Sequence, residues 1–166
     1  MEIRDERPGD AADIGALITQ AFLTAAHASG TEAQIVAGLR AAGALTLSLV
    51  AIEGGVIVGH IAFSEVLIDG EACGWFALGP VAVSPDRQGG GIGGALVRAG
   101  LARLEARGAA GCVLVGDPGY YGRFGFAADP ALQVDGVPGE YVLALPLTGP
   151  RVPGVITHHR AFGLGD

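Results

Sequence analysis

The chain of 166 residues contains no lysine and no asparagine, and all ten of its positively charged residues are arginine. Without lysine it cannot form a Walker-type phosphate loop, a Schiff-base enzyme or a site built on a lysine nucleophile. Seventeen acidic residues outnumber the arginines and give a net charge of −7. Binding to a nucleic-acid backbone needs a clustered positive surface, so we expect no nucleic-acid partner.

Cysteine is also scarce, because only Cys73 and Cys112 occur and both have mostly apolar neighbours. Two isolated cysteines cannot build a CxxC metal site, and we expect buried reduced thiols in a cytoplasmic protein rather than a disulfide. The N-terminal segment lacks an apolar core after a basic start, which argues against a signal peptide. No uncharged apolar run reaches about 18 residues, so no membrane span is predicted.

The apolar residues that are present predict a folded mixed α/β chain. Half of the residues are apolar and only 16% are charged, and the length fits a single domain over residues 1–166. Apolar periodicity predicts strands over 1–6, 45–52, 56–68, 75–83, 111–115, 140–145 and 155–162, with a hairpin turn at Asp69-Gly70. It predicts helices over 11–22, capped by Asp10, and over 31–42, 91–107 and 118–124.

The strand over 75–83 has an unusual feature. It is apolar on both faces, which predicts a central position in a sheet. It also contains Gly79-Pro80, and proline has no N–H to donate to a strand ladder. Either the strand assignment is wrong, or the sheet opens at this dipeptide through a bulge.

Glycine is abundant, and five of the 29 glycines lie within residues 89–94, between a buried strand and a helix. Free N–H groups at a helix start bind anions, and the missing side chains let phosphate oxygens approach. Glycine within a helix costs roughly 1 kcal/mol, so we favour a phosphate or pyrophosphate cradle over a flexible turn.

The same glycines allow a second interpretation as a small NAD(P)-binding oxidoreductase. Gly89, Gly91 and Gly94 satisfy the dinucleotide fingerprint GxGxxG, and Asp117 follows the next strand, where a ribose-binding acid is expected. Context disfavours this interpretation, because residues 84–88 separate the strand from the first glycine. A dinucleotide turn follows its strand directly.

Two motifs carry a family resemblance. Residues 88–93 read QGGGIG and match the pattern Arg/Gln-x-x-Gly-x-Gly/Ala, after the sequence VAVSP at 81–85. Residues 116–126 read GDPGYYGRFGF, with Tyr121 four residues before Gly125. On these residues the chain resembles the GNAT superfamily of acetyl-coenzyme A-dependent N-acetyltransferases, and the GDPxYYxRFGF stretch resembles one bacterial subgroup. The resemblance implies a central, mixed, mostly antiparallel sheet splayed at a bulge near Gly79-Pro80, with helices on both faces.

The resemblance also implies a site for acetyl-coenzyme A. A backbone N–H near Val81 or Ala82 would stabilise the oxyanion of the tetrahedral intermediate. Tyr121 would protonate the thiolate leaving group, because a tyrosine of pKa about 10 keeps its proton at neutral pH. The alternative for Tyr121 is a core aromatic role. The implied cofactor-binding residues are Val81, Ala82, Val83, Gln88, Gly89, Gly90, Gly91, Ile92, Gly93 and Gly94.

No residue is marked as the base that deprotonates the amine. The candidates near the acceptor side of related folds are Glu65, Asp69 and Glu71, any of which could act directly or through water. Carboxylates at such positions are more often solvated hairpin charges. His60 in its apolar strand is expected to be a satisfied core histidine. The adjacent His158 and His159 are expected on a strand, where neighbouring side chains point to opposite faces, so we predict no metal site.

Two residues beside the motifs have open roles. Arg87 could pair with coenzyme A phosphates or lie on the surface, and Tyr120 could pack or line the cofactor. The expected partners are acetyl-coenzyme A and a small-molecule or peptide amine, with a possible homodimer implied by the resemblance. A non-catalytic acyl-coenzyme A-binding or sensing module on the same fold is the main alternative function.

Overall fold

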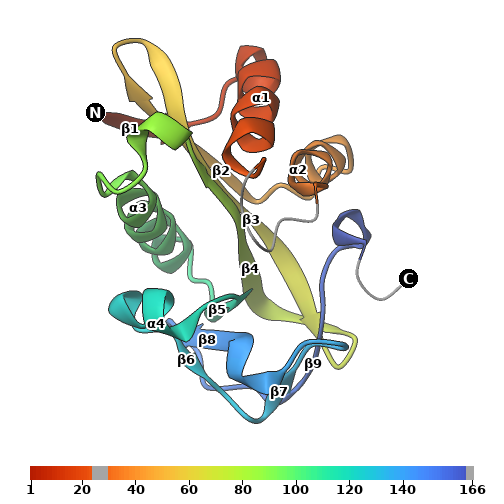
Figure 1. Ribbon diagram of the computed structural model, residues 1–166. Coiled ribbons are helices and arrows are strands. Elements are labelled where there is room, and N and C mark those ends of the chain that lie inside the picture. Colours follow the sequence, from red (N-terminus) through yellow and green to blue (C-terminus); the bar gives the residue numbers. More distant parts are fainter. Residues whose placement is uncertain (24–29, 164–166) are drawn as a thin grey trace. The chain divides into compact units, whose positions relative to one another are not determined.

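The computed structural model describes residues 1–23 and 30–163 (Figure 1). The strands are β1 Glu2–Asp5, β2 Leu47–Glu53, β3 Val56–Ile68, β4 Glu71–Val83, β5 Gly111–Val115, β6 Ala127–Ala128, β7 Leu132–Gln133, β8 Val142–Pro146 and β9 Gly154–Thr157. The α-helices are α1 Ala11–Ala21, α2 Glu32–Ala41, α3 Ile92–Ala106 and α4 Pro118–Tyr121. Short 3-10 helices are η1 Pro8–Asp10, η2 Pro85–Arg87, η3 Gly122–Phe124, η4 Gly139–Tyr141 and η5 Arg160–Phe162.

The strands hydrogen-bond in the order β1-β2-β3-β4-β5-β8-β6, and β9 pairs with both β3 and β7. The predicted central position of the strand around Trp75 is therefore confirmed, because β4 lies between β3 and β5. The chain divides into two compact units, and β3, β4 and α3 contribute residues to both. One unit contains Met1–Phe63 with Gly79–Gly100, and the other contains Ser64–Leu78 with Leu101–Asp166.

In the first unit, helices cover both faces of the antiparallel strands β2 and β3, as predicted (Figure 1). On one face, α1 and α2 pack against the strands through a buried apolar cluster. The cluster contains Ile14, Ile18, Val36, Val50, Ala62 and Ala82. The opposite face carries Gly59 and Phe63, which contact Ile92, Leu96 and Gly100 of α3. Successive strand residues point to opposite faces, so residues of even number on β3 face α1 and α2.

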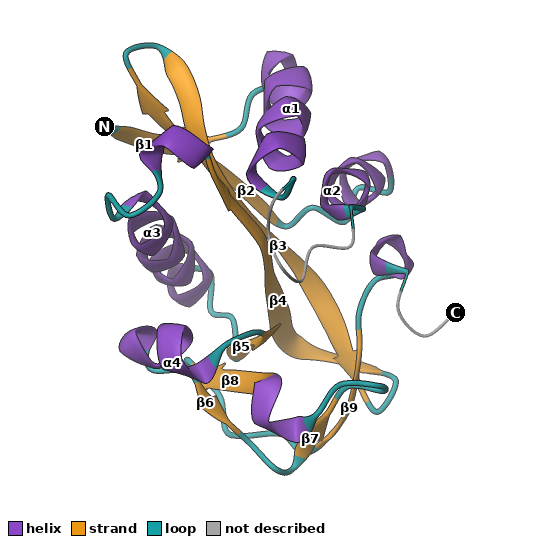
Figure 2. Ribbon diagram, in the orientation of Figure 1, coloured by secondary structure: helices purple, strands orange, loops and turns teal. Residues whose placement is uncertain are grey.

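In the second unit, β5 runs parallel to β4 and antiparallel to β8, around a core that includes Trp75, Val113 and Val142 (Figure 2). The β4–β5 ladder ends at Ala77–Val113, whereas the β5–β8 ladder continues to Val115. The pairing of β4 with β5 thus stops two residues before Gly79, which has a φ of 133° and a cis peptide to Pro80. The predicted splay at this dipeptide is confirmed.

Several predicted boundaries were wrong because local hydrogen bonds replace the regular element. The last strand ends at Thr157 rather than 162, since His159 Nδ1 accepts a bond from Ala161 N–H (3.0 Å) and starts η5. The strand predicted from residue 140 begins at Val142, after η4. The helix predicted over 118–124 divides into α4 and η3 and ends at Gly125, whose φ is 99°.

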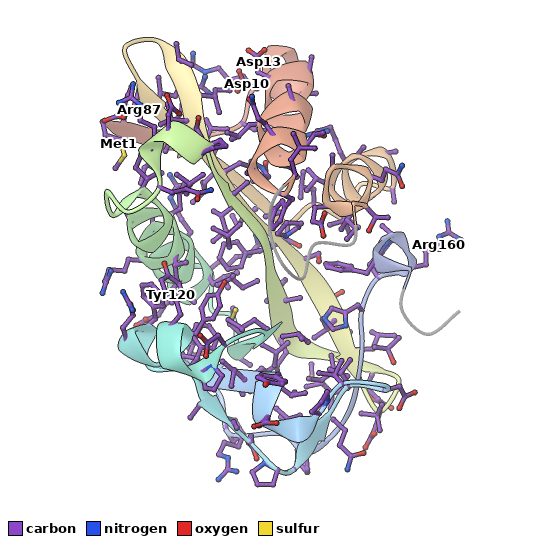
Figure 3. The ribbon with its side chains drawn as sticks, in the orientation of Figure 1. Met1, Asp10, Asp13, Arg87, Tyr120 and Arg160 are labelled. Carbon is purple, nitrogen blue, oxygen red and sulfur yellow. The ribbon has the colours of Figure 1, made fainter. Side chains whose placement is uncertain are left out.

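Two further differences concern the ends of elements. The hairpin strand predicted from residue 75 begins at Glu71, because Asp69 and Gly70 have φ values of 51° and 79° and form the expected two-residue turn. Asp10 does not cap α1 through its side chain (Figure 3). Its carboxylate instead accepts bonds from the Arg7 N–H (2.7 Å) and from Arg4 (2.8 Å).

Candidate functional site

The glycine loop connects the end of β4 to the start of α3 within the first unit. Ser84 N–H donates to the Val58 carbonyl (2.8 Å), which ties the end of β4 to β3. Gly89 and Gly91 have φ values of 85° and 87°, a region that side chains rarely adopt, and a Cβ on either would meet no atom within 4 Å. The loop therefore presents its backbone, unobstructed, on the surface.

The helix behind this loop begins without an acidic residue in its first turn. Its first intrahelical donor after the loop is Ala95 N–H, which bonds to the Gly91 carbonyl (3.0 Å). The N–H groups of Ile92, Gly93 and Gly94 precede it and have no carbonyl one turn back within the helix. These N–H groups and the positive end of the helix dipole favour an anionic ligand, as a phosphate cradle requires.

Side chains around the cradle are largely occupied by other contacts. Gln88 Nε2 donates to the Val83 carbonyl (3.2 Å), and the exposed Arg87 on η2 pairs with Glu53 on β2 (3.0 Å; Figure 3). The Ile92 and Ala82 side chains are buried in the core. Ile92 and Ala82, like the glycines of the loop, can therefore reach a ligand only through their backbone.

Tyr121 belongs to the second unit, where α4 holds it after β5. A Cβ on Gly116 would lie 2.8 Å from Tyr121 Cε2, so the missing side chain at Gly116 makes room for the ring. The ring also meets Tyr120 edge-on at 4.9 Å and Phe126 at 6.2 Å between centroids. Burial, with a smaller effect of Tyr120, raises the pKa of Tyr121 to about 12. The phenol consequently keeps its proton at every physiological pH.

Asp117 acts as the cap of α4. Its Oδ1 accepts a bond from Gly119 N–H (2.8 Å), and its carbonyl accepts one from Tyr121 N–H (3.0 Å). The interpretation of Asp117 as a ribose-binding acid is replaced by this capping role, which orients the tyrosine. Tyr120 packs on Tyr121, and the Arg123 guanidinium lies 4.4 Å from the Tyr120 ring centroid (Figure 3).

The three carboxylates considered as bases all lie on the surface. Glu65 and Glu71 are exposed. Asp69 is exposed in the hairpin turn, where its Oδ1 accepts a bond from Val155 N–H (2.8 Å). These positions match solvated hairpin charges more closely than a buried base.

His60 differs from its expectation as a satisfied core residue. It is fully buried, but only Nε2 has a partner, the Ser48 hydroxyl at 2.8 Å, while Nδ1 has none. Burial lowers the pKa of His60 to about 4. Ser48 in turn reaches Glu6. In the sequence, this contact was indicated only by the presence of the polar residues Ser48 and His60 within two apolar strands.

In the part of the chain that the structure describes, the other histidines and the two cysteines form no metal-ligating cluster. His158 and His159 lie beyond β9, not on a strand as expected, and the His158 ring packs 5.0 Å from that of Phe162. Both cysteines are free; Cys112 is buried as predicted, whereas Cys73 is only half-buried. Within residues 1–23 and 30–163, no cluster of three or more metal-ligating side chains occurs, and no helix is long and apolar enough to cross a membrane.

The splayed mixed sheet and the open helix start define an α/β protein whose glycine loop presents its backbone at the start of α3. The family model described as Acetyltransferase (GNAT) domain matches residues 2–128. The chain is 42% identical over 127 residues to the uncharacterised N-acetyltransferase YhbS of Escherichia coli K12, spanning 76% of this chain and 73% of that protein. The chain belongs to the GNAT acetyltransferase family.

Solved structures agree with this membership. A GNAT family acetyltransferase from Brucella melitensis, in complex with acetyl-CoA, is 51% identical, with a TM-score of 0.88 over 97% of each chain. Escherichia coli YhbS in complex with CoA is 35% identical, with a TM-score of 0.90 over 99% of this chain and 93% of the other.

Proposed function

We propose that residues 1–166 form one acetyltransferase domain that transfers the acetyl group of acetyl-coenzyme A to a primary amine by direct attack. The observation that carries the proposal is the cradle of Gly89–Gly94, whose open backbone N–H groups suit the pyrophosphate of coenzyme A. The complexes of the Brucella and Escherichia relatives with acetyl-CoA and CoA support the same ligand.

In the proposed reaction, the amine nitrogen forms a bond to the thioester carbonyl carbon, and the carbon–sulfur bond then breaks. A backbone N–H at Val81 or Ala82 stabilises the oxyanion of the intermediate. Tyr121 gives its proton to the departing thiolate, and its raised pKa of about 12 keeps that proton available. The protonated amine loses one proton before it attacks, and after the bond to carbon forms the nitrogen loses a second proton, which restores the phenol of Tyr121. The products are therefore an amide, free coenzyme A and one released proton.

A cationic acceptor is favoured, because the chain carries a net charge of −7 that attracts positively charged amines. We further propose a cytoplasmic location, since the free thiols Cys73 and Cys112 suit a reducing compartment. The homodimer that the family resemblance implies would be measured by sedimentation.

A thermal-shift screen with acetyl-coenzyme A, coenzyme A, NAD and NADP tests the cofactor first. We expect stabilisation by both forms of coenzyme A; stabilisation by NAD alone would refute the proposal. Acetyl transfer is then assayed with spermidine, kanamycin, phenylalanine and a peptide beginning with alanine. Binding of coenzyme A without acetylation of any amine would instead favour a non-catalytic acyl-coenzyme A sensor, which the exposure of Glu65 and Glu71 makes a real alternative.

A further inference from the structure

One ion pair of the first unit lies beside the cradle and joins the hairpin of β2 and β3 to η2. Arg87, labelled in Figure 3, donates through Nη1 to Glu53 Oε1 at 3.0 Å, and the two side chains are 47% and 34% exposed. Two other arginine–carboxylate pairs of this unit are shorter and less exposed: Arg40 with Glu6 at 2.7 Å, and Arg4 with Asp10 at 2.8 Å. Because exposed ion pairs contribute little, the pair beside the cradle is the easiest of the three to break.

Arg87 lies at the start of the glycine loop. Its N–H donates to the Ser84 carbonyl (2.8 Å), which fixes the residue directly after β4. Gly89, the first glycine of the cradle, is two residues further along, a span of at most about 7 Å. The loop also folds back onto Arg87, because a Cβ on Gly90 would lie 3.4 Å from the Arg87 carbonyl oxygen. The long arginine side chain can therefore reach a phosphate that the cradle holds.

Glu53 is on the face of β2 that α3 covers. Ile52 packs against the apolar cluster beneath α1 and α2, so its neighbours Ala51 and Glu53 point to the opposite face. A Cβ on Gly59 would meet Ile92 Cγ2 at 2.8 Å and Ala51 Cβ at 3.4 Å, so Ala51 lies close to the first residue of α3. Glu53 is the next residue of β2 on this face. Its place on the strand and its bond to Arg87 together hold the carboxylate near the start of α3.

The charges around the cradle favour an exchange of partners when a phosphate ligand binds. Glu53 would repel such a ligand, and so would the exposed carboxylate of Asp86, which accepts a bond from the Ser84 hydroxyl. Pyrophosphate carries more negative charge than a single carboxylate, and a guanidinium can hold two phosphate oxygens at once. In exchanging Glu53 for a pyrophosphate, Arg87 would lose one exposed bond and would neutralise the charge that enters the cradle.

We propose that Arg87 leaves Glu53 and binds the pyrophosphate of coenzyme A when this ligand enters the cradle, so that Glu53 competes with coenzyme A for the arginine. The inference rests on the proposed acetyltransferase function and adds two side chains to its coenzyme A site. Arg87 supplements the backbone N–H groups with a positive charge. Glu53 weakens binding, because its bond to Arg87 must break and its charge then repels the phosphates. Acetyl-coenzyme A and free coenzyme A share the pyrophosphate, so the competition lowers the affinity for both and speeds release of the product.

Three variants distinguish an exchanging arginine from a surface ion pair. Arg87→Gln removes the proposed phosphate contact, Glu53→Gln removes the competitor, and the double variant removes both. The matched controls are Arg151→Gln and Asp129→Asn, which remove the same charges from the pair of Arg151 with Asp129 (2.6 Å) in the second unit. Thermal unfolding of every variant identifies any loss of binding that reflects folding alone.

We expect calorimetric titration with coenzyme A to give a Kd about fivefold above that of the parent in Arg87→Gln and about threefold below it in Glu53→Gln. Both controls should stay within about twofold of the parent. The double variant should bind at least about fivefold more weakly than Glu53→Gln, a loss that cannot arise from an unpaired Glu53.

The outcomes separate this inference from the proposed function. Equal affinities of the double variant and Glu53→Gln, with a parent that binds coenzyme A, would overturn the exchange alone, because Arg87 would then only neutralise Glu53. A Glu53→Gln variant that binds no more tightly than the parent would overturn the competition. A parent that binds no coenzyme A would overturn the proposed function and the exchange with it.

A second titration identifies the phosphate that Arg87 binds. With 3′-dephospho-coenzyme A, which retains the pyrophosphate, the ratio of affinities between Glu53→Gln and the double variant should be the same as with coenzyme A. A ratio near one would show that Arg87 binds the 3′-phosphate and would overturn the assignment to the pyrophosphate.

Steady-state kinetics with the best acceptor of the amine panel provide the last measurement. Arg87→Gln should raise the KM for acetyl-coenzyme A without lowering kcat, because the phosphate contact is equally strong before and during acetyl transfer. An equal fall in kcat and in kcat/KM would contradict a role of Arg87 in binding alone and would overturn the proposal.

Discussion

The Phe63 ring on β3 fills the space that any side chain on Gly100 of α3 would need. A Cβ on Gly100 would lie 2.2 Å from Phe63 Cε1 and 2.4 Å from Cζ. The helix thus approaches the strand closely because residue 100 has no side chain.

We predict that Gly100→Ala lowers the free energy of unfolding by about 1–3 kcal/mol, because an overpacked core must shift. Gly15→Ala in α1 is the control, since a Cβ there meets no atom within 4 Å. It should raise the free energy of unfolding by up to about 1 kcal/mol through better helix propensity. Urea denaturation measures both, and equal effects would contradict the close approach.

Gly89→Ala should weaken binding of acetyl-coenzyme A about tenfold, because the strained loop moves its N–H groups away from the phosphates. Gly136→Ala introduces matched strain, since Gly136 has a φ of 80° against 85° at Gly89, and neither Cβ meets an atom within 4 Å. Calorimetric titration should detect weaker binding only in Gly89→Ala. Equal affinities of the two variants would refute the cradle.

The stability of the protein should fall between pH 7 and pH 5 because of His60. Its pKa is about 4 in the folded chain and about 6.5 in the unfolded chain, so the unfolded state binds more protons across this range. Unfolding free energy therefore decreases as the pH falls, by about 2 kcal/mol from this residue. Urea denaturation at pH 7 and pH 5 should show a smaller decrease in the free energy of unfolding for His60→Gln than for the parent protein. An equal decrease in both proteins would show that other titrating groups cause the effect.

Tyr121→Phe should reduce kcat by about 100-fold and leave the dissociation constant of coenzyme A unchanged, because only the proton donor is lost. The exposed Tyr141 in the same unit provides the control Tyr141→Phe, which should retain activity. Since the pKa of Tyr121 is about 12, activity of the parent should not decline through tyrosine ionisation below about pH 11. Full turnover by Tyr121→Phe would contradict the role of Tyr121 as proton donor and would indicate that the ring serves only in packing.

Periodicity in the sequence predicted the long elements well because each buries a regular stripe of apolar side chains. The strands β3 and β5 match the predicted ranges, and α3 differs by one residue at each end. The two-residue strands β6 and β7 were not predicted, because they are too short for a periodic pattern. The segment between them is held by contacts with residues distant in sequence. One such contact joins Asp129 to Arg151 at 2.6 Å.

The glycine loop and Tyr121 could be chosen from motifs because their residues lie close together in sequence. The hydrogen bonds that join Ser48 to Glu6 and to His60 could not be predicted in this way, since the three residues come from three separate segments. Only the antiparallel register of β2 with β3, and the bond from Glu6 N–H to the Ser48 carbonyl (2.9 Å), bring them together. The register between two strands cannot be predicted from the residue pattern within either strand alone.

The fit of the Tyr121 ring over Gly116 has an evolutionary consequence. Because a Cβ at position 116 would come within 2.8 Å of the ring, the two positions cannot change independently. A descendant that acquires alanine at 116 must tilt or replace its aromatic residue at 121 and would lose the phenol from its present place. We therefore expect that related proteins with a tyrosine in this position also have glycine at the position that corresponds to 116.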